Sequence, residues 1–183
     1  MKISTTTLPD NSLLNNNPQN YDYIDSFQSE INDPNNKIVS SDVGKAFFSS
    51  APKWVEALMT LRNKIVSVFG LKISNKISNR QQQLDDFKCE KGVQLGLFKV
   101  FEKNNNEVIL GENDKHLDFR VSLFIENIGT HQEKKMVTIS TTVMFHNWFG
   151  KAYFQLIRPF HRLIVPKMLK GILEKIAEKQ TNK

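Results

Sequence analysis

The sequence contains a single cysteine, Cys89, among its 183 residues. One thiol cannot form a disulfide within the chain, so a scaffold held together by disulfides is excluded and a reducing compartment is favoured. No stretch approaches the ~20 apolar residues that a membrane-spanning helix needs, and the first residues lack the apolar segment of a secretion signal. We therefore expect a cytoplasmic protein with no transmembrane segment.

Clustered charge of one sign is also missing. The net charge is +6, but the Lys and Arg residues are spread along the chain instead of forming a block. Because a nucleic-acid interface needs basic residues gathered on one face, this distribution argues against a nucleic-acid partner. Hydrophobic residues make up 39% of the sequence and include 13 Phe, which suffices for the core of one domain and makes that core aromatic.

The sequence also lacks the short motifs of common catalytic and metal sites. No HxH, HxxxH or HExxH spacing occurs, and Cys89 has no second cysteine that could join it as a zinc ligand. There is no GxSxG nucleophile motif, and the scattered glycines form no phosphate-binding loop. We therefore predict no metal and no cofactor.

The N-terminal residues differ in composition from the rest of the chain. Residues 1–20 are rich in Thr, Asn and Pro and have little apolar periodicity, so we expect a loosely ordered leader there. A single domain should follow over residues 21–178, with a short tail at 179–183. Within the domain, the alternation that begins at Tyr21 predicts a first strand that extends to Phe27.

Two helices are predicted after the first strand. The first is short and follows the capping residues Ser41 and Asp42. The second begins near Pro52, because proline is tolerated in the first turn of a helix, and ends at Gly70. Its apolar residues start at Trp54 and recur mostly at steps of three and four, so one face of this helix should pack against the core.

The second half of the chain is dominated by strand patterns. Apolar and polar residues alternate along the longer segments, and turn residues such as Asn104–Asn106 separate them. Long strands joined by short turns are typical of an antiparallel meander. The predicted strands cover residues 87–90, 93–103, 107–112, 116–126 and 136–146.

A long final helix is predicted over residues 148–178. Pro159 and Pro166 each remove a helix hydrogen bond, so we expect kinks or a break. Most of its Lys and Arg residues lie off the apolar stripe and should form a solvated face. The apolar stripe expected to face the sheet consists of Tyr153, Ile157, Phe160, Ile164, Met168, Ile172 and Ile176.

The order of one strand, two helices, several antiparallel strands and a long helix indicates an α+β fold. It resembles the helix-grip superfamily (SRPBCC) of START domains, birch-pollen-type allergens and polyketide cyclases, in which a curved antiparallel sheet, here of about six strands, wraps round a long C-terminal helix. The strings AFFSSAPKWV (46–55), GENDKHLDFR (111–120) and FHNWFG (145–150) are similar to those of a bacterial family known only as a domain of unknown function and placed with that superfamily. The resemblance covers about residues 21–176 and implies a fold and an internal cavity, but it supplies no catalytic residue.

This resemblance and the aromatic interior favour a non-catalytic protein that binds a hydrophobic or amphipathic small molecule, such as a lipid, in an internal cavity. A solid aromatic core is the structural alternative. A cyclase-, aromatase- or hydrolase-like enzyme and a protein-interaction module are the functional alternatives, and the oligomeric state stays open. The residues expected to line the cavity are Trp54, Phe98, Glu112, Phe119, Thr138, Ser140, Thr142, Phe145, Trp148, Tyr153 and Phe160.

The enzyme alternative has three candidate catalytic residues, His116, Asp118 and His146. His116 and Asp118 fall on one face of the predicted strand 116–126, where a carboxylate could orient an imidazole for acid–base chemistry. The apolar residues of that strand lie on its other face, which should therefore be the inward one. An outward Asp118 beside Arg120 is ordinary on a half-solvated sheet, so we favour a structural role for this cluster.

Overall fold

The computed structural model describes residues 1–16, 20–50, 87–129 and 133–181. The second predicted helix, with Trp54, lies outside these ranges. Within them the chain has the expected α+β composition, one antiparallel sheet and a long C-terminal helix. No helix among these residues is long and apolar enough to cross a membrane.

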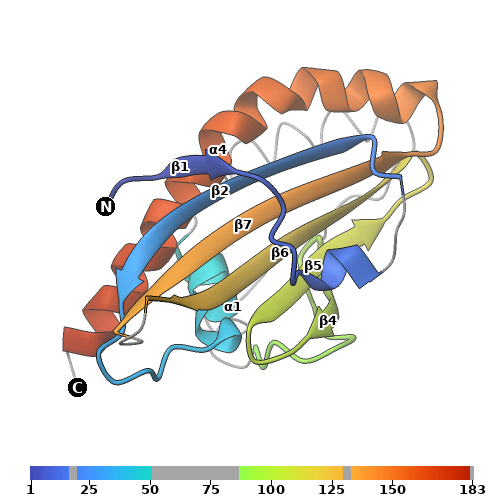
Figure 1. Cartoon of the computed structure of the whole chain (residues 1–183). Helices are drawn as coiled ribbons and strands as arrows, with labels where there is room; N and C mark the ends of the chain where they lie inside the picture. The colour runs from blue at the N-terminus through green and yellow to red at the C-terminus, as the bar shows by residue number, and fades with distance from the viewer. Residues whose placement is uncertain (17–19, 51–86, 130–132, 182–183) are drawn as a thin grey trace.

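The described strands form one antiparallel, open sheet of seven strands in the order β1-β2-β7-β6-β5-β4-β3 (Figure 1). The first long strand therefore lies beside the last one, and the intervening strands form a meander from one edge. The strands are β1 (Ser4–Thr6), β2 (Tyr23–Asn32), β3 (Gln94–Leu95), β4 (Phe98–Lys103), β5 (Glu107–Asn113), β6 (Leu117–Ile128) and β7 (Lys134–Phe145).

The strand count differs from the predicted six for local reasons. The segment predicted as a leader contributes β1, which pairs with β2 along residues 26–28. The single strand predicted over residues 93–103 is split into β3 and β4 by a turn at Gly96, whose φ of 62° suits glycine. Residues 87–90 are not a strand.

The described helices are η1 (Leu13–Asn16), α1 (Ser40–Ser49) and α4 (Trp148–Thr181). The predicted short helix is present as α1, but it begins before the expected capping residues, so Ser41 and Asp42 lie in its first turn. The Asp42 carboxylate accepts a hydrogen bond from the Val39 N–H just before the helix. α4 continues through Pro159 and Pro166 without a break. Its axis nevertheless changes direction between the two halves of the helix, as expected from proline within a helix (Figure 1).

The two longer helices pack on one side of the sheet, which we call the helix face (Figure 1). Alternate residues of each strand point to this face, because side chains alternate along a strand. Phe27, Ile139 and Leu123 lie across from one another on three neighbouring strands and belong to the core. Leu169 and Leu173 of α4 are fully buried against them.

The opposite side of the sheet, which we call the outer face, is crossed by the N-terminal segment between β1 and η1 (Figure 1). Glu107 is fully buried there. Its carboxylate accepts hydrogen bonds from the Ser12 hydroxyl at 2.6 Å, the Leu13 N–H at 2.6 Å and the Ser122 hydroxyl. These contacts hold the segment on the sheet, although composition predicted a loosely ordered leader.

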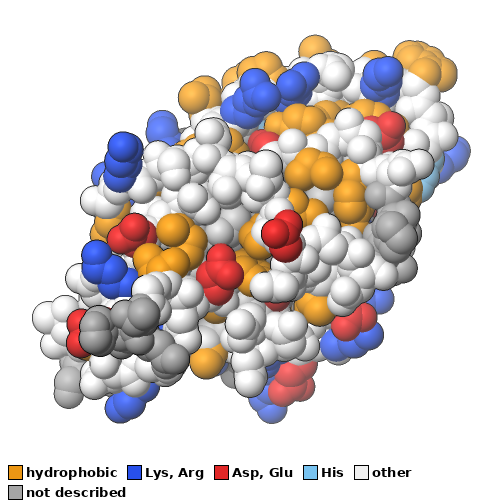
Figure 2. All heavy atoms as spheres, in the orientation of Figure 1, with side chains coloured by type: hydrophobic (Ala, Val, Ile, Leu, Met, Phe, Trp, Pro, Cys, Tyr) orange, Lys and Arg blue, Asp and Glu red, His pale blue; other side chains and the backbone are white. Residues whose placement is uncertain are grey.

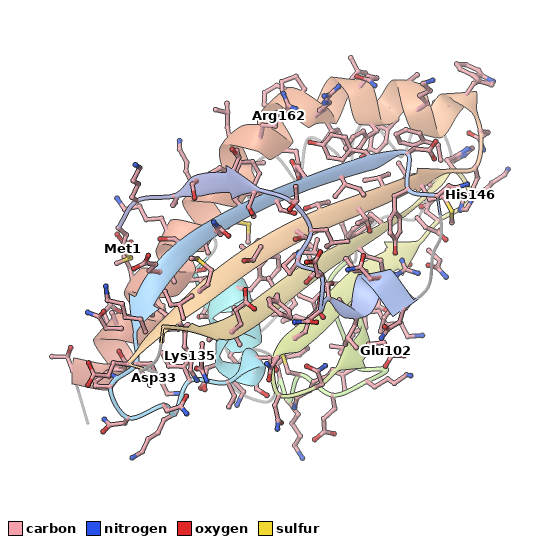
Figure 3. The ribbon with its side chains drawn as sticks, in the orientation of Figure 1. Met1, Asp33, Glu102, Lys135, His146 and Arg162 are labelled. Atoms are coloured by element: carbon pink, nitrogen blue, oxygen red, sulfur yellow. The ribbon has the colours of Figure 1, made fainter. Side chains whose placement is uncertain are left out.

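A buried ion pair joins the loop after β2 to the start of β7. The Lys135 ammonium lies 3.0 Å from the Asp33 carboxylate and donates to the Ile38 carbonyl at 2.6 Å (Figure 3). Burial alone would raise the pKa of Asp33, but hydrogen bonds from the Ile38 and Lys37 N–H groups and the charge of Lys135 hold it below its ordinary value. The pair therefore stabilises this end of the sheet in its charged form.

Candidate functional site

A polar cluster interrupts the apolar packing between β2 and the N-terminal half of α4. The Nε2 atom of His161 lies 3.2 Å from Asp25 Oδ1, and the Tyr23 hydroxyl donates to Asp25 Oδ2 at 2.6 Å. The His161 and Asp25 side chains are only 17% and 11% exposed. We call these three residues the His161 cluster.

The strand register brings the His161 cluster together. Tyr23 and Asp25 pair with Val143 and Thr141 of β7, which places both side chains on the helix face. α4 crosses that face and presents His161 to them. The carboxylate, the phenol and the imidazole are therefore brought together by the pairing of β2 with β7 and by the packing of α4. They do not form a motif in the sequence.

Aromatic rings surround the His161 cluster. The Tyr23 ring packs edge-on against Phe154, with centroids 4.7 Å apart, and Phe154 lies 5.6 Å from Phe145. The Tyr23 and His161 ring centroids are 6.2 Å apart. Polar groups in such a setting interact more strongly than they would in water.

The cluster also lies beside two cations. The Arg158 guanidinium is 5.3 Å from the centre of the Tyr23 ring. Burial and the neighbouring Asp25 raise the pKa of Tyr23, while a hydrogen bond and the charge of Arg162 act in the opposite direction. Tyr23 is therefore a neutral donor at pH 7. When His161 Nε2 donates to Asp25, the acceptor nitrogen of the neutral ring is Nδ1.

Several buried polar atoms near this interface have no hydrogen-bond partner among the described residues. They include Thr141 Oγ1 and Ser29 Oγ on the helix face and the Nε atom of Arg158. Thr141 is 3% exposed and lies directly across from Asp25. Buried polar groups normally have a protein or water partner, so this interface retains unused hydrogen-bonding capacity.

The predicted catalytic residues lie elsewhere, at the end of the sheet where β7 leads into α4. His146 lies at this end of the sheet (Figure 3). Its Nε2 atom is 3.0 Å from Asp118 Oδ1, so a histidine–carboxylate pair does form there. The partner is His146, whereas His116 is 3.1 Å from the Asn147 side chain. The register puts Asp118 on the outer face, and its pair with His146 is more exposed than the His161 cluster.

The predicted cavity residues divide between the two faces. Phe98, Phe119, Phe145 and Glu112 lie on the helix face as expected, and Phe98 packs against Phe119 with centroids 5.8 Å apart. The prediction was wrong for three polar residues of β7. Thr138, Ser140 and Thr142 are buried on the outer face, because they alternate with the apolar residues that face the helices.

The aromatic residues of α4 that were expected inside also differ from the prediction. Trp148 is 79% exposed at the start of the helix, and Phe160 is 51% exposed. Tyr153 is half-buried. In this half of the helix the buried side chains are those of Phe154 and Val165, so the inward face is rotated from the predicted stripe.

The sequence reasoning missed Tyr23, Asp25 and His161 as a group. Tyr23 and Asp25 lie two residues apart within the predicted first strand. If regular alternation had been assumed through to Phe27, both side chains would have been placed on the same face as Phe27. His161 carried no such signal, because nothing in its neighbourhood indicates a carboxylate that is distant in sequence.

A hollow lies at the other end of α4. This open pocket of about 800 Å³ is bounded by the loop after β2, by α1 and by the last turns of α4. Its charged side chains largely pair with one another, as Lys179 with Asp42 at 3.0 Å and Lys175 with Glu178 at 3.2 Å. The His161 cluster is the better candidate site, because the neighbouring Thr141 and Arg158 each have a buried polar atom without a partner among the described residues. The described part of the chain gathers no three His, Cys, Asp or Glu side chains that could hold a metal.

Comparison with known proteins gives one family. The family described as "Protein of unknown function (DUF2867)" matches residues 18–168. No curated protein matches the sequence. The chain is also similar to a conserved protein from Geobacillus kaustophilus, known from a crystal structure, with a TM-score of 0.44 and 12% identity over 85% of this chain and 96% of that one.

Proposed function

Because the chain belongs to the DUF2867 family, whose description names no activity, we propose a function from the site itself: the protein binds a small amphipathic molecule between the helix face and α4, without catalysis. The apolar part of the ligand would lie against Phe145 and Phe154, and its polar part would meet the His161 cluster. The observation that carries the proposal is that Thr141 Oγ1 and Arg158 Nε, both buried at this aromatic interface, have no hydrogen-bond partner among the described residues.

The helix-grip fold of START-like (SRPBCC) domains is part of the same proposal. It is supported by the chain order, in which β2 precedes α1, strands β3 to β7 follow, and α4 comes last. It is also supported by the position of β2 beside β7 and by the curvature of the sheet across α4 (Figure 1). In that fold the space between sheet and last helix is the place for an apolar ligand.

The charges around the His161 cluster indicate which chemical group the polar end of the ligand should carry. Arg158 and Arg162 lie next to Tyr23, and the carboxylate of Asp25 is already engaged by Tyr23 and His161. The remaining capacity is therefore mostly that of hydrogen-bond donors. A ligand with an anionic or strongly accepting group, such as a long-chain carboxylic acid, fits these donors best.

One observation favours an enzyme as the second candidate. His161 and Asp25 form a shielded imidazole–carboxylate pair, the arrangement in which a carboxylate orients histidine as a general acid or base. The catalytic residue would then be His161 instead of the candidates chosen from the sequence, which were His116, Asp118 and His146. A cyclase- or hydrolase-like reaction on the bound molecule would use the Nδ1 atom of His161, because Nε2 is engaged by Asp25.

Native mass spectrometry of freshly purified protein, followed by organic extraction, tests the binding proposal. We expect a co-purifying amphipathic molecule in the wild type and its loss in His161→Gln, which keeps a polar side chain but removes the imidazole. The matched control is His146→Gln, which breaks a histidine–aspartate pair on the outer face and should retain the molecule. Equal retention by both variants would contradict the assigned site.

A titration separates the remaining outcomes. If nothing co-purifies, the wild type should still bind a long-chain fatty acid in isothermal titration calorimetry, and absence of binding there would defeat the proposal. The enzyme candidate instead requires that the extracted molecule change chemically during incubation with the wild type but not with His161→Gln.

We also propose a cytoplasmic location. Cys89 is fully buried, and burial raises the pKa of its thiol to about 11, although Lys103 and Lys45 act in the opposite direction. Such a thiol is protonated and unreactive at neutral pH. A chain with one inert cysteine and no disulfide fits a reducing compartment.

A further inference from the structure

The N-terminal half of α4 carries a second apolar stripe, and this one faces away from the sheet. Leu156, Phe160 and Leu163 are 70%, 51% and 63% exposed. Steps of four and three residues place them on one side of the helix, and we call them the outer stripe. Trp148, 79% exposed, lies roughly two turns before Leu156. Large apolar side chains gathered on one surface usually mark an interaction site.

The same part of α4 carries charge of one sign. From Trp148 to Leu173 the sequence contains no Asp or Glu, and the first carboxylate of the helix is Glu174. In Figure 2 the upper edge of the molecule, over this half of α4, shows hydrophobic and Lys or Arg side chains side by side. Lys167 and Lys170 continue the spacing of the outer stripe and are exposed. The other cations of the segment are Lys151, Arg158 and Arg162, of which Arg158 packs inward on Tyr23.

We propose that the outer stripe docks on the surface of an anionic phospholipid bilayer, with Leu156, Phe160 and Leu163 at the boundary between headgroups and acyl chains. A helix with Phe and Leu on one side and Lys beside them is the usual form of such a contact. The negative lipid surface attracts each nearby cation, at roughly fivefold in affinity per residue. The inward-facing His161 cluster takes no part in this contact, so the proposal does not rest on the proposed function.

The long run without carboxylates favours a bilayer over a protein partner. A protein interface usually has alternating charges at its rim that set the register of the two surfaces. Here no carboxylate occurs in the helix from Trp148 to Leu173, and the first one, Glu174, pairs with Lys170 where this run ends. An anionic bilayer matches that pattern, because its surface is negative everywhere and requires no particular register.

Flotation of the full-length chain with vesicles of equimolar phosphatidylcholine and phosphatidylglycerol tests the proposal, with pure phosphatidylcholine vesicles as the reference. We expect binding to the anionic vesicles and about a hundredfold weaker binding for Leu156→Ser/Phe160→Ser/Leu163→Ser. The matched control Ile24→Ser/Val93→Ser removes exposed apolar residues from other elements and should bind like the wild type. All these side chains are exposed, so circular dichroism should report intact folding.

The charge contribution has its own pair of variants. Lys167→Gln/Lys170→Gln should weaken binding about 30-fold, whereas Lys88→Gln/Lys91→Gln, with the same change of charge on exposed residues elsewhere, should have little effect. The proposal is overturned if the wild type fails to float with anionic vesicles, or if the stripe variant and its control bind equally. It is also overturned if light scattering finds a dimer that the stripe variant abolishes, because the stripe would then be a self-interface.

Discussion

The two halves of α4 contact the rest of the molecule in different ways. In the C-terminal half, Leu169, Ile172 and Leu173 are completely buried in the apolar core between the sheet and α1. In the N-terminal half, the inward contact includes the hydrogen bond of His161 to Asp25, while Leu156 and Leu163 face outward. The C-terminal half thus buries its large apolar residues, whereas the N-terminal half buries Phe154 but exposes Leu156 and Leu163.

This difference suggests a division of roles along the helix. Burial of apolar side chains in the C-terminal half supplies most of the free energy that holds α4 on the sheet. The N-terminal half places polar groups inside and apolar groups outside, which lowers stability. Departures of this kind are expected where a protein binds something. The following four variants test the comparison in order of expected effect.

Leu169→Ala should have the largest effect, because the side chain is fully buried between the sheet and α1. We expect the free energy of unfolding to fall by about 2–5 kcal/mol, from lost burial and from the cavity left behind. Urea denaturation followed by circular dichroism measures it. A loss smaller than ~1 kcal/mol would mean that the C-terminal half is not the anchoring half.

Asp25→Ala should destabilise the protein by about 1–3 kcal/mol, because the His161 imidazole and the Tyr23 hydroxyl would both lose a buried partner. The control is Asp118→Ala, which removes the partner of the more exposed His146 and should cost less than ~1 kcal/mol. If both variants lose the same stability in thermal unfolding, the His161 cluster is no more shielded than the outer pair.

Tyr23→Phe should lower stability at neutral pH by about 0.5–1.5 kcal/mol, the usual contribution of one hydrogen bond. Because the folded state raises the pKa of Tyr23, its contribution is complete below about pH 10 and is lost as the pH rises from there through the folded pKa. The wild type should therefore lose more stability than Tyr23→Phe between neutral and strongly alkaline pH. If urea denaturation shows that both proteins lose the same free energy of unfolding as the pH becomes alkaline, the raised pKa of Tyr23 is contradicted.

Leu163→Ala should have the smallest effect, within ~0.5 kcal/mol, because the side chain is 63% exposed. It is the same substitution as Leu169→Ala, six residues earlier on the same helix, so the two results compare the halves directly. A loss comparable to that of Leu169→Ala would place Leu163 in a packed contact and remove it from the outer stripe.

The same comparison explains which parts of the fold could be predicted from the sequence. In the C-terminal half the predicted stripe of Met168, Ile172 and Ile176 is buried, because there hydrophobicity marks the inward direction. In the N-terminal half the predicted stripe included Phe160, which lies on the exposed side of the helix. Periodicity follows apolar residues, and in this half an inward position is held by His161, whose partner Asp25 is distant in sequence.

Strands were predictable for a related reason. β5, β6 and β7 each have one apolar side against the helices, and the predicted ranges match them closely. β1 was missed because its three residues, Ser4–Thr6, have no apolar face and are held in place by pairing with β2. For the site, the sequence placed Phe98, Phe119 and Phe145 on the helix face, but contacts between distant strands and helices leave no local pattern.

The position of β2 next to β7 has a consequence for the order of folding. The register joins Tyr23 to Val143, so the contact closes a very long loop, whereas β5, β6 and β7 are joined in sequence order. Non-local contacts form late because the entropy of loop closure opposes them. During synthesis at about 5–20 residues per second, β2 would wait on the order of ten seconds for its partner strand. Over that interval Asp25 and Tyr23 have no imidazole beside them, so the His161 cluster is among the last contacts to form.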